Sequence, residues 1–298
     1  MTTIEHPIID EIKDVFDFMC ANDIAEYDEP DSDFGDLEDE WKETDLKRDV
    51  WILKENGRIC GYSLVSGEGD RFHMDLYAHN DHTPAGWIDR LIEPALERVK
   101  EKKGNNPDKV RLTVYSCNVN RGVGEALRRY GFSVHTWHYR MQVDFSGPME
   151  VVEWPQDFSI GPYTPDAEEE LYNLIKSTFD WQEHEMPPIE DWRKHLFRGG
   201  RFDPDYFLLV RKDGKLVGAA LSYNEGPWGW IRQLAVSKDL QGQGFGSKLL
   251  RHMFHIYQQA GKKSVALGVA SLNQNAFQFY ERVGMKKTRE FGEYRIEL

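Results

Sequence analysis

Hydrophobic positions in the second half of the chain follow two different periods. Short apolar runs bounded by turn residues predict strands at residues 206–211, 216–224, 229–236 and 264–269, with a last strand ending in 294–298. Apolar residues at helical spacing predict helices at 165–179, 189–196, 244–260 and 273–283. Strands with intervening helices are typical of the α/β class.

The first half repeats part of this pattern. Asn56-Gly57 and Asp213-Gly214 each separate two apolar runs and predict β-hairpins, at an offset of 157 residues. Residues 110–131 likewise echo 264–284, at an offset of 153. Two pairings in the same order and at similar offsets predict one fold used twice.

The remaining pattern concerns the start of the chain and the boundary between the two copies. An amphipathic helix is expected at 8–19, and the acidic stretch 26–45 is expected to be a solvated loop or helix face. Glycines and prolines cluster in 145–164. Because 298 residues suffice for two ordinary domains, we predict a first domain at 1–150 and a second at 151–298.

Charge limits the kinds of partner. Lys and Arg number 37 against 51 Asp and Glu, a net charge of −14, which argues against a nucleic-acid binder or a protein held on anionic membranes. The imbalance lies in the first half, where 1–150 contains 31 acids and 18 bases, whereas 151–298 contains 20 and 19. The two halves are therefore chemically different, and a cationic partner suits the first.

Other features carry little chemistry. No window approaches a membrane-spanning length of uncharged apolar residues, so we expect a cytoplasmic protein without a signal peptide or membrane span. Three cysteines, far apart and odd in number, are typical of reduced thiols. His79 and His82 lack further ligands at metal-binding spacing, so no metal site is expected.

One glycine-rich segment does suggest chemistry. A predicted strand ends near Val236, glycines occupy positions 242, 244 and 246, and a helix follows. Backbone N–H groups then converge at a helix N-terminus, where the helix dipole is positive, and the missing Cβ atoms allow close approach. The spacing fits neither the dinucleotide GxGxxG pattern nor the GK[ST] loop of nucleotide triphosphatases. The segment predicts a pyrophosphate cradle, with a purely structural turn as the alternative.

Two motifs carry a resemblance to a known superfamily. The pattern [RQ]-x-x-G-x-[GA] is matched by Gln241, Gly244 and Gly246. The pattern N-x-x-A-x-x-x-Y, followed by a glycine four residues later, is matched by Asn273, Ala276, Tyr280 and Gly284. In both respects the chain resembles the GCN5-related N-acetyltransferase (GNAT) superfamily, strongly over 155–298 and weakly over the first half, in a tandem arrangement similar to that of the mycothiol synthases.

The resemblance implies a fold and a reaction. Each half is expected to form a mixed, mostly antiparallel sheet flanked by helices. Acetyl-coenzyme A would donate an acetyl group to a primary amine by direct attack in a ternary complex, without a metal. The acceptor is left open among thiol-precursor amines, polyamines, antibiotics, peptides and protein N-termini. The alternative is a non-catalytic acyl-coenzyme A binding or regulatory module.

The resemblance also implies roles for matching residues. A strand segment would splay from its neighbour and offer backbone groups to the pantetheine arm and the thioester oxygen: Leu234, Ala235 and Val236. Main-chain N–H groups of the following turn would hold the pyrophosphate: Gln241, Gly242, Gln243, Gly244, Phe245, Gly246 and Ser247. Asn273 would contact the pantetheine arm or position its helix. Tyr280 would stand near the sulfur as general acid, with a core aromatic as the alternative interpretation.

The general base is missing from its usual place. Many superfamily members have a glutamate four residues before the position of Leu234, where this chain has Trp230. The substitutes considered are Glu225 on the preceding hairpin, taken as the catalytic candidate, and the cluster Glu183-His184-Glu185. The missing glutamate favours the non-catalytic alternative. In the first half Leu127 stands where the repeat offset places Tyr280, so no conventional coenzyme site is expected there.

Overall fold

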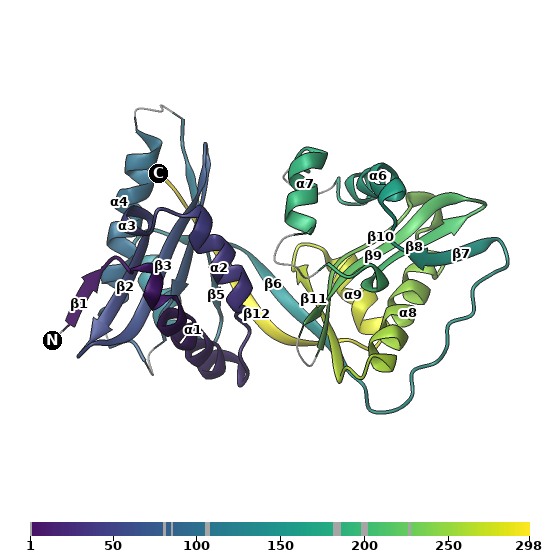
Figure 1. Ribbon diagram of the computed structural model, residues 1–298, viewed down its shortest axis with the longest axis horizontal. Coiled ribbons are helices and arrows are strands. Elements are labelled where there is room, and N and C mark those ends of the chain that lie inside the picture. Colours follow the sequence, from purple (N-terminus) through teal and green to yellow (C-terminus); the bar gives the residue numbers. More distant parts are fainter. Residues whose placement is uncertain are drawn as a thin grey trace. The chain divides into compact units, whose positions relative to one another are not determined.

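The computed structural model describes the chain except for residues 1, 80–81, 85, 105–107, 181–185, 198–201 and 226–227. It divides into two compact units (Figure 1). Unit 1 comprises Met1–His138 and Arg289–Leu298, and unit 2 comprises Tyr139–Thr288. No helix in the described part of the chain is long and apolar enough to cross a membrane.

Unit 1 is built on a sheet with the strand order β1-β2-β3-β4-β5-β12. Its strands are β1 (Thr2–Glu5), β2 (Val50–Glu55), β3 (Arg58–Glu68), β4 (Arg71–Tyr77), β5 (Arg111–Cys117) and β12 (Lys286–Glu297). Its helices are α1 (Ile12–Tyr27), α2 (Phe34–Glu43), α3 (Leu46–Asp49), α4 (Asp89–Lys103) and α5 (Arg121–Arg129). β4 and β5 run parallel, whereas β1–β2, β2–β3, β3–β4 and β5–β12 are antiparallel pairs.

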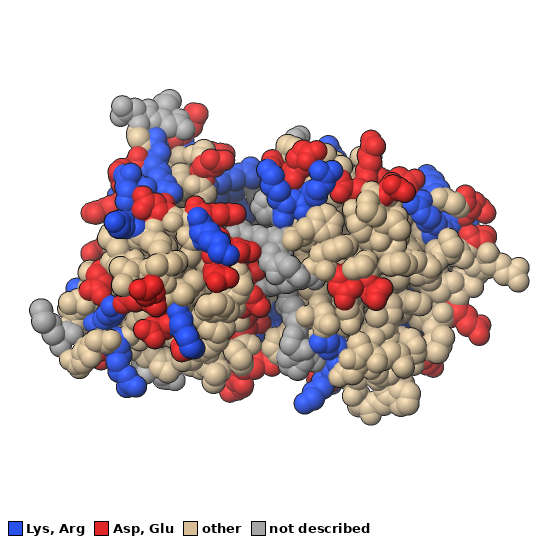
Figure 2. All heavy atoms as spheres, viewed as in Figure 1, with Lys and Arg blue, Asp and Glu red and all other residues tan. Residues whose placement is uncertain are grey.

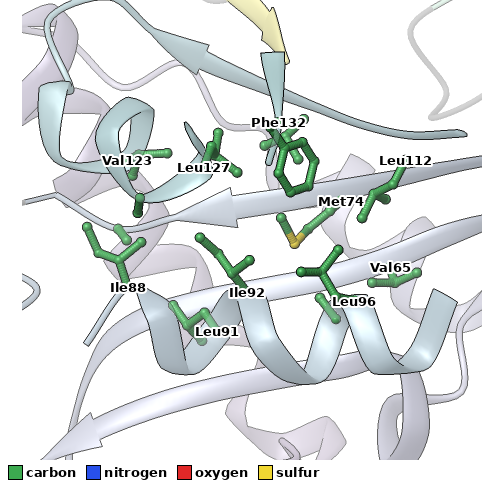
Figure 3. Packing of buried hydrophobic residues seen from close by; sticks show 14 of the residues in the cluster. Val65, Met74, Ile88, Leu91, Ile92, Leu96, Leu112, Val123, Leu127 and Phe132 are labelled. Carbon is green, nitrogen blue, oxygen red and sulfur yellow. The ribbon is translucent and has the colours of Figure 1, made fainter. Parts of the chain in front are cut away.

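Alternation along the strands places helices on both faces of the unit 1 sheet. Val50 and Ile52 of β2 belong to a buried cluster with α1 and α2, whereas Trp51 and Leu53 belong to the cluster with α4 and α5. Figure 3 shows the second cluster, in which apolar residues of α4 and α5 pack against β3, β4 and β5. The unit is therefore a helix–sheet–helix sandwich.

Unit 2 repeats this architecture with the strand order β7-β8-β9-β10-β11-β6. Its strands are β7 (Phe158–Pro162), β8 (Phe207–Lys212), β9 (Lys215–Glu225), β10 (Trp228–Val236), β11 (Ser264–Ala270) and β6 (Ser133–Asp144). Its helices are α6 (Glu168–Thr178), α7 (Ile189–Leu196), α8 (Phe245–Gln259) and α9 (Gln274–Arg282). α6 and α7 cover one face, and α8 and α9 cover the other.

The two predicted hairpins are confirmed. β2 and β3 meet at Asn56-Gly57, and β8 and β9 meet at Asp213-Gly214. All four turn residues have positive φ angles, between 47° and 82°, as a two-residue turn with the natural twist of a hairpin requires. The predicted α/β class, with a mixed, mostly antiparallel sheet in each of two similar units, is also confirmed.

The compact units differ from the predicted division at residue 150. Unit 2 begins at Tyr139, within β6, and the last ten residues belong to unit 1 rather than to the second domain. In each unit the sixth strand therefore comes from the other half of the chain. The physical reason is pairing: residues 291–297 of β12 form an antiparallel ladder with β5, and Tyr294 is buried in the unit 1 core.

Part of the acidic stretch forms a helix, the second of its two expected forms, and one face of that helix is buried. Residues 34–43 form α2, whose Leu37 and Trp41 are buried, and the Trp41 indole donates to the Tyr62 hydroxyl at 3.0 Å. Its acidic side chains point outward. Unit 1 contains 32 acids and 19 bases and unit 2 contains 19 and 18. Figure 2 shows acids spread over the visible face of unit 1 among Lys and Arg side chains.

Glu293 of β12 forms polar contacts that hold this strand in unit 1. We expect these contacts to make the free energy of unfolding of unit 1 fall at acid pH. Its carboxylate is buried, accepts a hydrogen bond from His138 Nε2 at 2.8 Å and pairs with Arg295. Burial acts to raise the pKa of Glu293, but the hydrogen bonds and charges of His138 and Arg295 outweigh it and lower the pKa to about 2. A lowered pKa stabilises the folded state above the unfolded pKa near 4.5, and this contribution is lost as the pH falls toward 2.

Glu293→Gln is therefore expected to lower the free energy of unfolding of unit 1 by roughly 3 kcal/mol at neutral pH and to flatten its dependence on acid pH. Hydrogen exchange of β12 and β5 amides as a function of pH would measure this. The matched control is Glu297→Gln on the same strand, where the carboxylate is more exposed and pairs with Arg111. Equal acid sensitivity in the wild type and Glu293→Gln would contradict the assignment.

Candidate functional site

The turn before α8 has the geometry that the glycine pattern predicts. Gly242 and Gly244 have φ angles of 76° and 87°, in the left-handed region that favours glycine, and a Cβ atom on either would meet no atom within 4 Å. α8 begins at Phe245, directly after Gly244. The turn is therefore open on its outer side, and the first N–H groups of the helix, which have no partner within the helix, lie beside it. These are the features of an anion site.

Two glutamine side chains support the turn from within. Gln241 Nε2 donates to the Val236 carbonyl at 2.9 Å, and Gln243 Nε2 donates to the Asp239 carbonyl at 2.7 Å. Both amides are thus engaged with the backbone of their own loop. The Lys248 ammonium, on the first turns of α8, donates to the Glu153 carbonyl at 3.0 Å. The turn is thus held in shape by its own side chains. The Gln241 N–H donates to the Lys238 carbonyl, and the N–H groups that follow it in the turn are left to face a ligand.

Strands β10 and β11 part beside this turn. Their parallel pairs run from Trp228 with Ser264 to Ile231 with Leu267, although β10 continues to Val236. The pairing of β10 with β9 continues to the end of the strand, after an irregularity between Ile231 and Gln233. The second half of β10 therefore stays paired with β9 but is no longer paired with β11.

The alternation of hydrogen-bonded positions between β10 and β9 shows which backbone groups of β10 face the gap left by β11. The Ser237 N–H donates to the Val217 carbonyl of β9 at 2.8 Å. Bonded and non-bonded positions alternate in an antiparallel pair, so Ala235 also directs its N–H and C=O toward β9. Leu234 and Val236 direct theirs to the side that β11 has left. The Val236 carbonyl accepts from Gln241, so the backbone groups of Leu234 remain for a ligand.

Asn273 and Tyr280 enter the same region from α9. The Asn273 side chain accepts from the Ala276 N–H at 3.1 Å and caps the helix. Tyr280 lies two turns later, and its hydroxyl makes no hydrogen bond with any residue that the structure describes. Burial raises the pKa of Tyr280 to about 12, so its phenol keeps its proton throughout the physiological range.

A pocket of about 660 Å³ joins these features. It is lined by Thr178, Phe179, Leu234, Val236, Gln241, Gly242, Gly244, Gly246, Ser247, Asn273, Asn275, Ala276, Phe279, Tyr280 and Arg282. The lining within the described chain contains no acidic side chain and one cation, which suits an elongated anionic ligand. Sequence reasoning did not assign six of these residues to the site: Thr178, Phe179, Asn275, Ala276, Phe279 and Arg282. Arg282 follows Tyr280 by two residues, but no spacing rule marked it as part of the site.

Three of the predicted coenzyme-binding residues do not line this pocket. Ala235 is fully buried on the face covered by α6, and its backbone pairs with Ala219 of β9. The Phe245 ring stacks on Phe158 with centroids 4.7 Å apart, so only its backbone can serve the turn. Gln243 holds the loop, as described above. These positions support the site through the backbone or from behind.

The proposed bases receive no support from geometry. Residues 183–185 lie outside the described residues, and the structure describes Glu225 only as the last residue of β9, paired with Trp228. Trp230, at the position where the superfamily often has glutamate, packs with the Arg140 guanidinium 5.6 Å from its ring centroid. The described residues contain no group of three or more side chains placed to bind a metal.

Comparison with known proteins places this site in a family. The sequence model of the acetyltransferase (GNAT) family matches residues 168–285, which include the turn, both parting strands and α9. This segment is a GNAT acetyltransferase domain. Its family uses acetyl-coenzyme A as co-substrate, and the absence of acids from the described lining fits that polyanion.

Relatives extend the likeness beyond the matched segment. The chain is 25% identical over 257 residues to a mycothiol acetyltransferase of Acidothermus cellulolyticus, covering 80% of this chain and 76% of the relative. It is also 25% identical over 142 residues to N-alpha-acetyltransferase 30 of Schizosaccharomyces pombe, covering 46% of this chain and 89% of that protein. The homologues support assignment of this chain as an acetyltransferase.

Solved structures show the same fold over the whole length. A GCN5-related N-acetyltransferase from Sphaerobacter thermophilus superposes with a TM-score of 0.84 at 21% identity, covering 99% of this chain and 95% of the other. A tandem GNAT protein from the clavulanic acid biosynthesis pathway has a TM-score of 0.73 at 13% identity, covering 100% and 98%. Both units of this chain therefore have counterparts in known folds.

The cap on α9 allows a test of how Asn273 acts. Asn273→Ala is expected to lower the free energy of unfolding of unit 2 by about 1 kcal/mol, because a helix loses its N-cap. Asn273→Ser, which restores a capping oxygen, is the matched control. Chemical unfolding and titration with coenzyme A should be measured on both variants. If Asn273→Ser recovers both the stability and the coenzyme A affinity of the wild type, Asn273 has a positioning role. Unchanged coenzyme A affinity in Asn273→Ala would contradict any role in the coenzyme site.

Proposed function

We propose that unit 2 binds acetyl-coenzyme A and transfers its acetyl group to a primary amine by direct attack within a ternary complex. The observation that carries the proposal is that one pocket joins an open helix N-terminus, the free backbone of a parted strand and a protonated tyrosine. These are, in order, groups suited to a pyrophosphate, an amide-containing arm with its thioester, and a leaving thiolate.

The proposed roles follow from what each group can donate. N–H groups of the turn from Gly242 to Ser247 hold the pyrophosphate, Gln241 supports the turn through its side chain, and Arg282 adds a positive charge at the pocket wall. The Leu234 N–H donates to the thioester oxygen, where negative charge develops as the amine attacks. A backbone donor in that position is typically worth about 3 kcal/mol of transition-state stabilisation.

Tyr280 serves as the general acid that protonates the leaving sulfur. Burial raises its pKa to about 12, so transfer to a thiolate with an ordinary pKa near 8.5 is more uphill than for an exposed phenol, by about 1.4 kcal/mol for each pKa unit. The same dry pocket disfavours the thiolate as well, which raises the pKa of the thiol and narrows the difference.

Loss of a proton from the amine requires a separate group or a pocket that lowers the amine pKa. An amine with a pKa near 10.4 is neutral in only about one molecule in 2,500 at pH 7, a penalty of roughly 4.6 kcal/mol. Trp230 cannot accept a proton. Glu225 and the Glu183-His184-Glu185 cluster remain the proposed bases, acting directly or through water.

Donor binding can be tested at Gly244. Gly244→Glu is expected to weaken acetyl-coenzyme A binding by roughly 100-fold, because it places a carboxylate in the phosphate turn. The matched control is Gly214→Glu in the β8–β9 hairpin, a glycine with a φ of 82° and equally open surroundings. It suffers the same backbone strain and gains the same charge. Isothermal titration of both variants separates the effects, and equal loss of affinity, or no binding by the wild type, would refute the assignment.

The acid role of Tyr280 can be tested by turnover. Tyr280→Phe is expected to lower kcat roughly 100-fold in a thiol-release assay with a panel of amines while leaving acetyl-coenzyme A affinity nearly unchanged. A general acid works only while it is protonated, so deprotonation of Tyr280 would lower kcat only near pH 12. Below about pH 10, the pH profile of kcat should therefore have the same shape in Tyr280→Phe as in the wild type. Unchanged kcat would exclude the acid role. Tight donor binding without turnover on any amine would favour a non-catalytic module.

A further inference from the structure

Unit 1 has its own parted strands, and a pocket lies beside them. The parallel pairs of β4 and β5 run from Arg71 with Arg111 to His73 with Thr113, although β4 continues to Tyr77. This is the same arrangement as β10 and β11 in unit 2. A pocket of about 220 Å³ opens there, lined by residues of α1, β4, β5 and β12 and by the residue that caps α5. It occupies the place in unit 1 that corresponds to the coenzyme pocket of unit 2.

The charge of this pocket is opposite to that of its counterpart. Its described lining includes Asp23, Glu26, Asp31 and Asp75 but no lysine or arginine. Two of these acids already have partners: His73 in the lining bonds Asp75 at 3.0 Å, and Arg289, which lies over the Tyr27 ring, pairs with Asp31. Asp23 and Glu26 have no cationic partner among the ion pairs of the described residues. The described lining in unit 2 includes Arg282 and no acid. Carboxylates in a cleft repel phosphates, so the pocket of unit 1 is unsuited to coenzyme A.

Hydrogen bonds inside the pocket fix the positions of the acids. Glu26 Oε1 accepts from Asn22 Nδ2 at 3.1 Å and from Asn120 Nδ2 at 2.5 Å. Asp23 Oδ2 accepts from the Asp31 and Ser32 N–H groups at 2.9 and 2.7 Å. Burial raises the pKa of both carboxyls even though these hydrogen bonds act to lower it. A cation in the pocket would relieve this cost of burial.

One buried oxygen points independently to a ligand. Asn22 is 3% exposed and lines the pocket, yet its Oδ1 has no hydrogen-bond partner in the part of the chain that the structure describes. Its Nδ2 is already engaged with Glu26, so the group left over is an acceptor. A buried acceptor without a donor costs free energy, which a ligand N–H group would recover.

Aromatic rings complete the lining. Tyr27, Tyr77, Tyr115 and Phe291 all contribute to the pocket, with the rings of Tyr27 and Phe291 5.7 Å apart. Aromatic faces attract organic cations, and their apolar bodies accept an alkyl chain. Nowhere in the described residues do three or more ligating side chains converge as a metal ion requires. The lining thus favours an organic ammonium ion over a metal.

We propose that this pocket binds a small primary ammonium ion, with Asn22 Oδ1 and the carboxylates of Glu26 and Asp75 accepting its N–H groups. The assignment concerns unit 1 alone and does not depend on acetyl transfer by unit 2. A volume of about 220 Å³ accommodates a short alkylamine. The former coenzyme cleft of the first repeat would then be an amine site.

The test uses the full chain and four probes: propylammonium, its neutral isostere 1-propanol, tetramethylammonium and coenzyme A. Saturable shifts of the Asn22 and Asn120 side-chain amide signals in nuclear magnetic resonance titrations report occupancy, and the Asn120 signals serve in variants that lack Asn22. Propylammonium is expected to bind, 1-propanol not to bind, and tetramethylammonium to bind more weakly because it has no N–H donor. Equal binding of 1-propanol, displacement of propylammonium from these signals by coenzyme A, or no shift with propylammonium would overturn the proposal.

Variants locate the site. Asn22→Leu, which keeps the size and removes the acceptor, and Glu26→Gln, which removes one charge, are each expected to weaken propylammonium binding roughly tenfold or more. The matched control is Asp17→Asn, which removes a charge from the exposed side of the same helix and should leave binding unchanged. If Asn22→Leu or Glu26→Gln fails to fold, Asp75→Asn replaces it as the test variant. Unchanged propylammonium binding by Asp75→Asn would contradict the proposal.

Repeating the titration on Gly244→Glu separates this inference from the proposed function. Propylammonium should bind that variant as it binds the wild type, even though acetyl-coenzyme A binding is lost. In the wild type, propylammonium binding without turnover on any amine would leave the unit 1 site standing while the enzyme assignment fails. Lost acetyl-coenzyme A binding together with lost propylammonium binding would instead contradict an independent pocket in unit 1.

Discussion

The parting of two parallel strands is the constraint on which both units depend. Where β11 leaves β10 and β5 leaves β4, backbone N–H and C=O groups lose their sheet partners. Such groups must find partners elsewhere, from side chains, water or a ligand. A fold that opens its own sheet in this way has a built-in binding cleft. The chemistry of each cleft is then set by the few side chains that surround the opening.

Charge distinguishes the two clefts. In unit 2 a turn with two left-handed glycines and a helix N-terminus faces the opening, so a polyanion finds main-chain donors and no described acid. In unit 1 the helix before the opening carries Asp23 and Glu26, and β4 adds Asp75. Under the two proposals, the same backbone geometry would bind ligands of opposite sign. The charge imbalance between the units, visible from composition, follows this difference in part, although many of the acids of unit 1 are exposed on helices far from its pocket.

The sequence was informative where local chemistry determines structure and less so where pairing over long distances does. The turns at Asn56-Gly57 and Asp213-Gly214 and the glycine turn before α8 depend on φ angles that neighbouring residues specify, and they could be predicted. The return of residues 289–298 to unit 1 depends on a ladder with β5, some 180 residues earlier, and nothing in the local pattern of β12 reveals its partner. Likewise, Arg282 and Asn22 belong to pockets only because of how their helices pack.

Burial of Tyr280 shows why the missing glutamate matters for mechanism. A phenol whose pKa is raised to about 12 gives up its proton only when the acceptor is a strong base in the same dry pocket. A thiolate formed there meets that condition, but it forms only as the amine completes its attack, so the amine must already be neutral or be losing its proton. With Trp230 in place of the glutamate, that second proton must leave through a loop side chain or water, or the pocket must bind the neutral amine. The proposed mechanism thus assigns the acid to a half-buried residue of α9 and leaves the base to the edge of the site, which is where acceptor specificity is expected to vary.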